Sequence, residues 1–164
     1  MAYAAVADLV ARFGAAELVQ LTDVTNIPPS AMDDERIELK LADAGAFIDG
    51  YVGQVYRLPL AGCSKPDGVG GFTLVPPPVL VRLACDLARY YLYDDLAPEH
   101  EVYRRYKAAL AELEAIASGT VQLACPWGGS PGELIGVDAQ SGGDETQACF
   151  SPRAITDDTL RGFG

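Results

Sequence analysis

The sequence is poor in residues that build metal sites or bind nucleic acid. Its 164 residues include a single histidine, His100, and four cysteines that lie far apart. No two cysteines form a C-x-x-C pair, so we expect no metal site and no cofactor. Lys and Arg number 12 against 23 Asp and Glu, for a formal charge of −11. Phosphate-driven binding of nucleic acid needs clustered basic residues and is therefore disfavoured.

Long apolar runs are also missing. No stretch approaches the roughly 20 apolar residues of a membrane span. The first stretch, MAYAAVADLVARFG, carries Asp8 and Arg12 inside its apolar pattern, which is unlike a signal peptide. We therefore expect a cytosolic protein with reduced thiols, in which no disulfide joins Cys63, Cys125 or Cys149. Nearly half of the residues are apolar, which predicts one folded domain with an ordinary core.

Helical periodicity dominates the first 119 residues. In the clearest case the N-cap Asp33 is followed by apolar residues from Ile37 to Val55 at spacings of 4, 3, 4, 3 and 4. The predicted helices are residues 4–13 with a further turn or two after Gly14, the stretch after Asp33, the stretch from Pro78, and the stretch from Pro98 to Gly119. The fold class is therefore mainly α, a small bundle of about four helices over residues 1–119.

Two regions depart from the helical pattern. Residues 56–76 place the β-capable pieces YRLPL and FTLV around a centre rich in Gly, Pro, Ser and Asp, which predicts a protruding hairpin-like loop. Residues 120–164 are rich in Gly, Ser, Asp and Pro and contain only short apolar islands. Such a segment cannot build its own core, so we expect an extended tail that docks on another chain.

Two charged groups and one aromatic group are candidate surfaces for self-association. The polar stripe is Arg82, Asp86 and Arg89, which share one side of their predicted helix, and the basic patch is Arg104, Arg105 and Lys107. A solvated helix face is the alternative explanation for both. The tyrosines at the junction of two helices are a modest sign of an interface, and they are Tyr90, Tyr91, Tyr93, Tyr103 and Tyr106.

The motifs that could carry chemistry have simpler explanations. The run from Gly128 to Gly132 matches G-x-S-x-G, but no histidine follows Ser130, so we expect a turn. Cys85 and His100 lie on different predicted helices, and a buried free cysteine is the common case. The acidic run that starts at Asp33 fits a helix N-terminus better than a cation site. We therefore expect no catalytic residue and no enzyme activity.

The order of four stretches resembles the head–tail connector, or adaptor, proteins of tailed phages, in the branch found in Mu-like phages and prophages. The stretches are MAYAAVADLVARFGAAELVQLTD, LADAGAFIDGYVGQVYRLPL, VPPPVLVRLACDLARYYLYDD and RYKAALAELEAIASGTVQL. The ending TDDTLRGF is similar to a recurring ending in that group. The loop over residues 61–74 looks longer than is typical there.

The resemblance implies a non-enzymatic virion protein of the neck, at the head–tail interface, assembled in the host cytoplasm. It would form a homo-oligomeric ring, commonly a dodecamer, beneath the portal protein. The ring would extend the channel through which double-stranded DNA passes without specific binding, and it would dock the next neck or tail protein, a stopper or a tail terminator. No membrane is involved.

Within this hypothesis, the residues themselves suggest two contact surfaces. The lateral ring interface would use Arg82, Asp86, Arg89, Arg104, Arg105 and Lys107, and tail docking would use Ile155, Asp158, Leu160, Arg161 and Phe163. One alternative is the next ring down, a head-completion stopper, although such proteins tend to be small β-rich barrels. Another, from a different class, is a small cytosolic enzyme or binding module.

Overall fold

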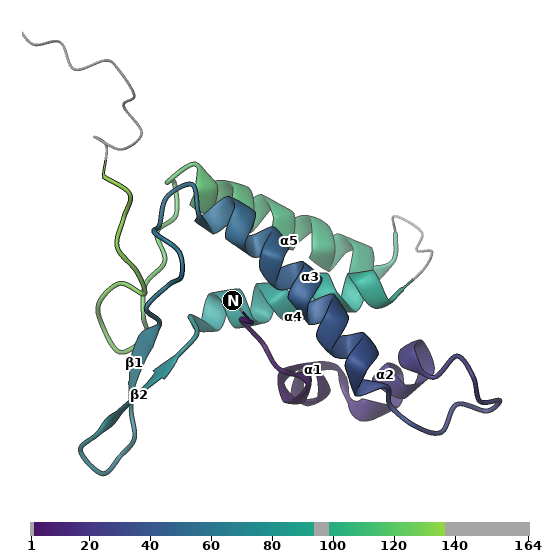
Figure 1. Ribbon diagram of the computed structural model, residues 1–164. Coiled ribbons are helices and arrows are strands. Elements are labelled where there is room, and N and C mark those ends of the chain that lie inside the picture. The colour runs from purple at the N-terminus through teal and green to yellow at the C-terminus, as the bar shows by residue number, and fades with distance from the viewer. Residues whose placement is uncertain (1, 94–98, 137–164) are drawn as a thin grey trace, which may run out of the picture.

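The computed structural model describes residues 2–93 and 99–136, and it confirms the mainly α class (Figure 1). The described helices are α1 (Val6–Phe13), α2 (Ala15–Thr22), α3 (Asp34–Val52), α4 (Pro78–Leu92) and α5 (Glu101–Ala117). Strands β1 (Cys63–Pro66) and β2 (Phe72–Val75) form one antiparallel hairpin. The chain thus contains the expected helices and hairpin-like loop, with the first helical stretch divided at Gly14.

Helix α3 follows its sequence pattern closely. The Asp33 side chain accepts a hydrogen bond from the Arg36 backbone N–H at 3.1 Å, which satisfies one of the unpaired donors of the first turn. The predicted apolar positions Ile37, Ala44 and Ile48 are fully buried. Their spacing places them on one side of the helix, and that side packs against α4 and α5.

Helix α4 is more enclosed than its sequence pattern predicts. Every residue from Leu83 to Ala88 is buried, although a surface helix would expose part of each turn. Helices α3 and α5 pack on α4, and α1 covers it from another side (Figure 1). The polar stripe was expected to lie on an open side, and this was wrong for Asp86, which is only 8% exposed. Periodicity within one helix cannot show that α1 and α2 fold back over it.

The loop between α2 and α3 is organised by Asp23, a role that the sequence pattern did not indicate. Its carboxylate accepts backbone hydrogen bonds from Asn26 at 3.0 Å, Ser30 at 2.8 Å and Ala31 at 3.1 Å. These bonds stabilise the charged form and hold the pKa of Asp23 well below its usual range. One buried carboxylate thereby fixes the course of the residues between the two helices.

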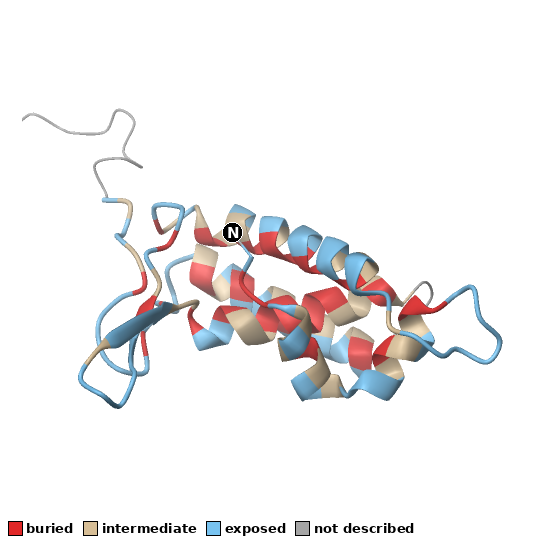
Figure 2. Cartoon of the chain, turned by 60° about the horizontal axis from the view of Figure 1, so that its bottom comes forward, coloured by how far each residue is buried: buried red, intermediate tan, exposed pale blue. Residues whose placement is uncertain are grey.

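The hairpin protrudes from the helices and is largely exposed (Figure 2). Its register pairs Cys63 with Val75 at the base and Pro66 with Phe72 near the tip. At the tip the Asp67 carboxylate accepts backbone hydrogen bonds from Val69 at 2.9 Å and Gly71 at 2.8 Å. Phe72 is 72% exposed. The predicted protruding loop is therefore a two-stranded hairpin, but its first strand is Cys63–Pro66 and not the predicted piece YRLPL, in which Tyr56 forms an isolated β-bridge with Leu134.

Residues 120–136, which we call the return segment, pack against the chain's own core. Ile135 N–H donates to the Val55 carbonyl at 2.8 Å, and Arg57 N–H donates to the Glu133 carbonyl at 2.8 Å. Leu123 is 5% exposed, and its N–H donates to the Tyr56 hydroxyl at 2.8 Å. The expectation that everything after residue 119 reaches out to another chain is therefore wrong for this segment. Residues 137–164 lie outside the described residues.

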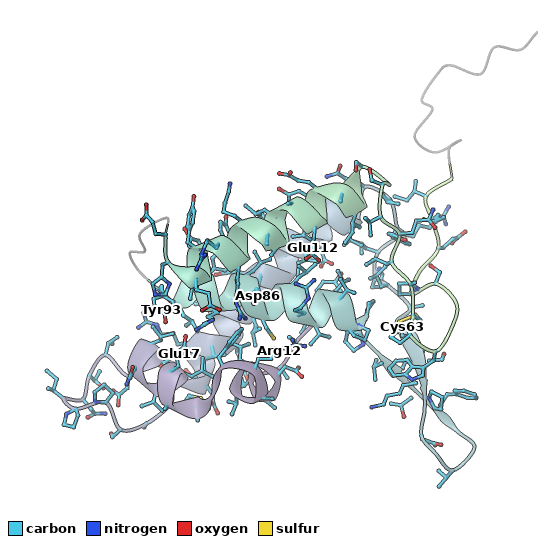
Figure 3. All side chains as sticks on the ribbon, turned by 180° about the vertical axis from the view of Figure 1, so that it is seen from behind. Arg12, Glu17, Cys63, Asp86, Tyr93 and Glu112 are labelled. Atoms are coloured by element: carbon cyan, nitrogen blue, oxygen red, sulfur yellow. A yellow bond between two sulfur atoms is a disulfide. The ribbon has the colours of Figure 1, made fainter. Side chains whose placement is uncertain are left out.

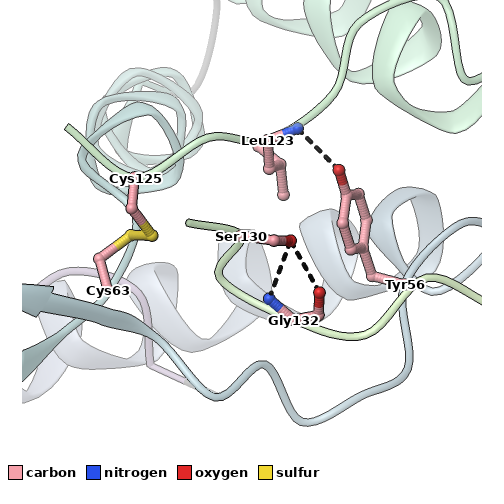
Figure 4. The surroundings of a disulfide bond; sticks show 6 residues. All are labelled: Tyr56, Cys63, Leu123, Cys125, Ser130 and Gly132. Carbon is pink, nitrogen blue, oxygen red and sulfur yellow. Dashed lines mark hydrogen bonds between the residues drawn. A yellow bond between two sulfur atoms is a disulfide. The ribbon is translucent and has the colours of Figure 1, made fainter. Parts of the chain in front are cut away.

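A disulfide between Cys63 and Cys125 joins the hairpin base to the return segment (Figure 4). The two Cα atoms lie 5.4 Å apart, although the residues are 62 positions apart in the sequence. The expectation of reduced thiols at these positions was wrong. Cysteine spacing alone could not reveal the pairing, because it depends on the return segment folding back beside β1.

Candidate interaction surfaces

The residues that could have suggested a thiol enzyme have structural roles. Cys85 is fully buried in α4, and burial raises the pKa of its thiol to about 11. A protonated thiol is a poor nucleophile, because the thiolate is the reactive form. His100 caps α5, where its Nδ1 accepts a hydrogen bond from Val102 N–H at 3.2 Å.

The G-x-S-x-G match is a turn, as predicted. Gly128 and Gly129 have φ values of 98° and 83°, which side chains disfavour. Ser130 Oγ donates a hydrogen bond to the Gly132 carbonyl at 2.7 Å within the same turn (Figure 4). Within residues 2–93 and 99–136, no group of three or more His, Cys, Asp or Glu side chains could hold a metal ion.

One end of the polar stripe is engaged by α2. Arg89 Nε donates to Glu17 Oε1 at 2.7 Å and its Nη2 donates to Oε2 at 2.9 Å, a bidentate pair. The Tyr93 hydroxyl donates to the same carboxylate at 3.0 Å. Figure 3 shows Glu17 and Tyr93 close together where α2 meets the end of α4. This cluster ties α2 to α4 within one chain.

The rest of the stripe points toward α5. Arg82 forms ion pairs with Asp86 on its own helix, at 3.7 Å, and with Glu112 on α5. Burial raises the pKa of Asp86, although Arg82 and other nearby guanidinium groups oppose the shift. The Arg82 side chain keeps 40% exposure, so it alone in the stripe retains a substantial open surface. Contact of the stripe with a neighbouring copy stays a prediction.

The basic patch lies on the open side of α5. Arg104, Arg105 and Lys107 are all exposed. Arg105 pairs with Glu101 at 2.7 Å one turn earlier, while both side chains remain more than half exposed. The patch is therefore accessible to a partner, and its role in a ring stays a prediction.

Four of the five predicted tyrosines cluster at the junction of α4 and α5, while Tyr93 contacts Glu17 and His100 instead. The rings of Tyr90 and Tyr106 stack with their centroids 3.9 Å apart. Tyr91 and Tyr103 contact this pair at wider angles, with centroid distances of 6.1–6.4 Å. All four side chains are half-buried. Packing between the two helices accounts for most of the cluster, and the exposed edges remain available.

The family described as Bacteriophage Mu, Gp36 matches residues 3–133 of this chain. The chain belongs to this family. Among Gp36-like relatives, Gene product J of Escherichia phage Mu is 34% identical over 122 residues, which are 73% of this chain and 74% of that protein. The Mu-like prophage FluMu protein gp36 of Haemophilus influenzae is 31% identical over 93 residues, which are 57% of this chain and 56% of that protein. The chain is thus a Mu-like phage protein, and its family indicates a structural or morphogenesis role.

The residues that match the Gp36 family nearly coincide with the part of the chain that the structure describes. The match runs through most of the return segment and ends close to the last described residue, Gly136. The residues expected to dock on a partner lie outside both the match and the described residues, and they are Ile155, Asp158, Leu160, Arg161 and Phe163. None of the described helices is long and apolar enough to cross a membrane.

Proposed function

We propose that this Gp36-family protein is a head–tail adaptor of the phage neck. Copies form a ring under the portal, the ring continues the DNA channel, and its far side docks the next neck or tail protein. The observation that carries the proposal is the family membership of a mainly helical core with one protruding hairpin. A stopper would be expected to be a β-rich barrel, and the two short strands among the described residues do not form one.

The charge of the chain is consistent with this role. A formal charge of −11 per copy surrounds passing DNA with negative charge and disfavours tight phosphate contacts. The buried thiol and the capping histidine provide no obvious catalytic pair, so we propose a structural role without enzyme activity.

Lateral contact in the ring would be heterologous, so each copy needs two different complementary surfaces. The basic patch is one candidate, because its three cations are exposed on a protein of opposite net charge. Its complement would be an acidic surface of the neighbouring copy, with Arg82 at the edge of the contact.

Loss of the protein tests the neck assignment directly. A phage that lacks this chain should produce DNA-filled heads and separate tails, and adding the purified protein to such heads should restore tail joining. Cryo-electron microscopy of the restored particles should place a ring of this chain under the portal. Normal joining without the protein, or its absence from purified particles, would sink the proposal.

Charge reversal tests the lateral surface. Arg104→Glu with Lys107→Glu should leave the helical circular dichroism spectrum unchanged and reduce ring formation on heads. Lys40→Glu is a suitable control. Lys40 lies on α3 beside Asp43, on a different helix from the basic patch, and its replacement by Glu also makes the net charge more negative. Equal loss in the control would show that net charge, rather than the patch, is responsible.

A further inference from the structure

A groove of about 490 Å³ lies between α1, the first turn of α4, the N-terminal segment and the hairpin base. We call it the hairpin groove. In Figure 1 the hairpin and α1 extend from the same side of α4. Pro78 and Val81 of α4 provide an apolar surface, together with Val75 from the end of β2. The groove has no role in the contacts described so far.

The walls of the groove are fixed by contacts within the chain. The N-terminal segment is anchored by Tyr3, which is 2% exposed and donates its hydroxyl hydrogen to Asp49 of α3. On the other side Trp127 follows Cys125, whose disulfide to Cys63 holds it at the hairpin base. The groove therefore exists without a partner and needs no rearrangement to receive one.

The charges in the groove are unusual for this protein. Arg12 and Lys65 are both exposed and both line it. Asp8 is the acidic residue among the lining side chains, and its carboxylate accepts the Ala5 N–H at 2.8 Å as part of the α1 cap. Two cations beside an apolar surface, on a chain of charge −11, favour a ligand that is both acidic and apolar.

Trp127 adds an aromatic wall. Its side chain is 43% exposed, and Lys65 Nζ lies 6.0 Å from the ring centroid. A partly exposed tryptophan offers a large surface on which an apolar side chain can pack, and tryptophan is enriched at binding hot spots.

The end of this chain has the matching composition. Residues 155–164 contain two acidic side chains and one basic side chain, for a net charge of −1. Asp157 and Asp158 lie three and two positions before Leu160, and Phe163 follows three positions after it. We propose that the hairpin groove binds residues 155–164 of a second copy of this chain. Arg12 and Lys65 pair with the aspartates, while Leu160 and Phe163 pack on Trp127 and the first turn of α4.

The second copy follows from the proposed ring, on which this inference rests. The 18 residues between Gly136 and Ile155 can extend over roughly 60 Å, which is enough to reach a neighbour. Each copy would then give one C-terminal segment and receive another, and such linked contacts add avidity to a lateral interface. The two contacting surfaces differ, as a closed heterologous ring requires.

Trp127 is the only tryptophan, so its fluorescence reports directly on the groove. The receptor is the full chain carrying Leu160→Ser and Phe163→Ser, which removes the anchors of its own C-terminal segment. A synthetic peptide of residues 155–164 should shift its emission to shorter wavelength in a saturable manner. The fluorescein-labelled peptide should show the same affinity by anisotropy. The affinity should fall at least tenfold with Lys65→Glu or Arg12→Glu, and it should be unchanged with Lys40→Glu.

Cross-linking separates the second copy from the same copy. A photoreactive residue in place of Phe163, in a mixture of ¹⁵N-labelled and unlabelled full chains on heads, should give cross-links to α1 or the hairpin between the two isotopic forms. Cross-links confined to single chains would overturn the proposal, as would a peptide that leaves the emission of Trp127 and the anisotropy unchanged. If the groove proposal fails while the chain is still found in the neck, the adaptor function stands alone.

Discussion

Asp23 and Asp86 are both buried aspartates, but their surroundings move their pKa values in opposite directions. Backbone N–H groups surround the carboxylate of Asp23 and lower its pKa, while burial raises the pKa of Asp86 against the opposing effect of nearby guanidinium groups. A lowered folded-state pKa contributes stability above the unfolded value of about 3.8, and that contribution is lost as the pH falls below it. For Asp86 the sign is reversed, and the contribution is lost as the pH rises.

Substitution of Asp23 should therefore weaken the protein most at neutral pH. Asp23→Asn should lower the free energy of unfolding near neutral pH, and the difference from the wild type should shrink as the pH falls below about 4. Asp86→Asn is the matched control and should lose less stability near neutral pH than Asp23→Asn, because burial disfavours the ionised form of Asp86. Urea denaturation at several pH values measures both. A larger loss in Asp86→Asn than in Asp23→Asn would contradict this account.

The Glu17–Arg89 pair gives a second prediction at this scale. Glu17→Gln should lower the free energy of unfolding by about 1–3 kcal/mol, because it leaves a partly buried guanidinium without its counter-charge. The side chains of Glu17 and Arg89 are 24% and 15% exposed. Glu112→Gln, at the more exposed pair with Arg82, should cost less than about 1 kcal/mol by the same urea measurement. Equal losses would mean that burial does not set the strength of these pairs.

At the scale of elements, the disulfide should contribute measurably to stability. Replacing Cys63 and Cys125 together by Ser should lower the free energy of unfolding by about 2–4 kcal/mol and leave the helical spectrum unchanged, because the bridge closes a long loop. Dithiothreitol should have the same effect on the wild type and none on the double variant. A free-thiol assay in denaturant, which exposes Cys85, should find two fewer thiols in the unreduced chain than in the reduced one. Four reactive thiols without reductant would show that the bridge is not formed.

The elements also show which parts of the fold were predictable. Helix α3 was predictable, because its N-cap and its apolar spacing are local features of Asp33 and the residues that follow it. The hairpin was predicted only in part: FTLV is its second strand, but its first strand is Cys63–Pro66, within the stretch expected to form the turn-rich centre, and not YRLPL. The enclosure of α4 was not predictable, because it depends on packing against α1, which is distant from α4 in the sequence. The position of the return segment was also not predicted. It is held by isolated backbone hydrogen bonds to a part of the chain without regular structure, and such bonds produce no periodic pattern in the sequence.

The candidate surfaces divide in the same way. The basic patch was visible in the sequence and is exposed, while Arg89 was taken as a surface residue and is engaged by Glu17. The hairpin groove was not foreseen. Its lining side chains, among them Arg12, Lys65 and Trp127, come from three separate parts of the chain, and only the folded structure brings them together.

At the scale of the whole molecule, the return segment sets the boundary of the folded unit. The free energy of unfolding of a chain that ends after Gly136 should lie within about 1 kcal/mol of that of the full chain. A chain that ends after Gly119 should be less stable by at least about 3 kcal/mol, because it loses the disulfide and the burial of Leu123. Thermal and urea denaturation of the two truncated chains make the comparison. Equal stability would mean that the return segment contributes little to the core.

The attachment of the return segment also determines how the molecule would respond to pulling. Tension applied beyond Gly136 would first strain the Ile135–Val55 and Arg57–Glu133 hydrogen bonds. It would then meet the covalent link between Cys125 and Cys63 before it could peel away the end of α5. A tether anchored in this way passes mechanical load into the hairpin base and spares the helices, which the proposed place in the phage neck would require.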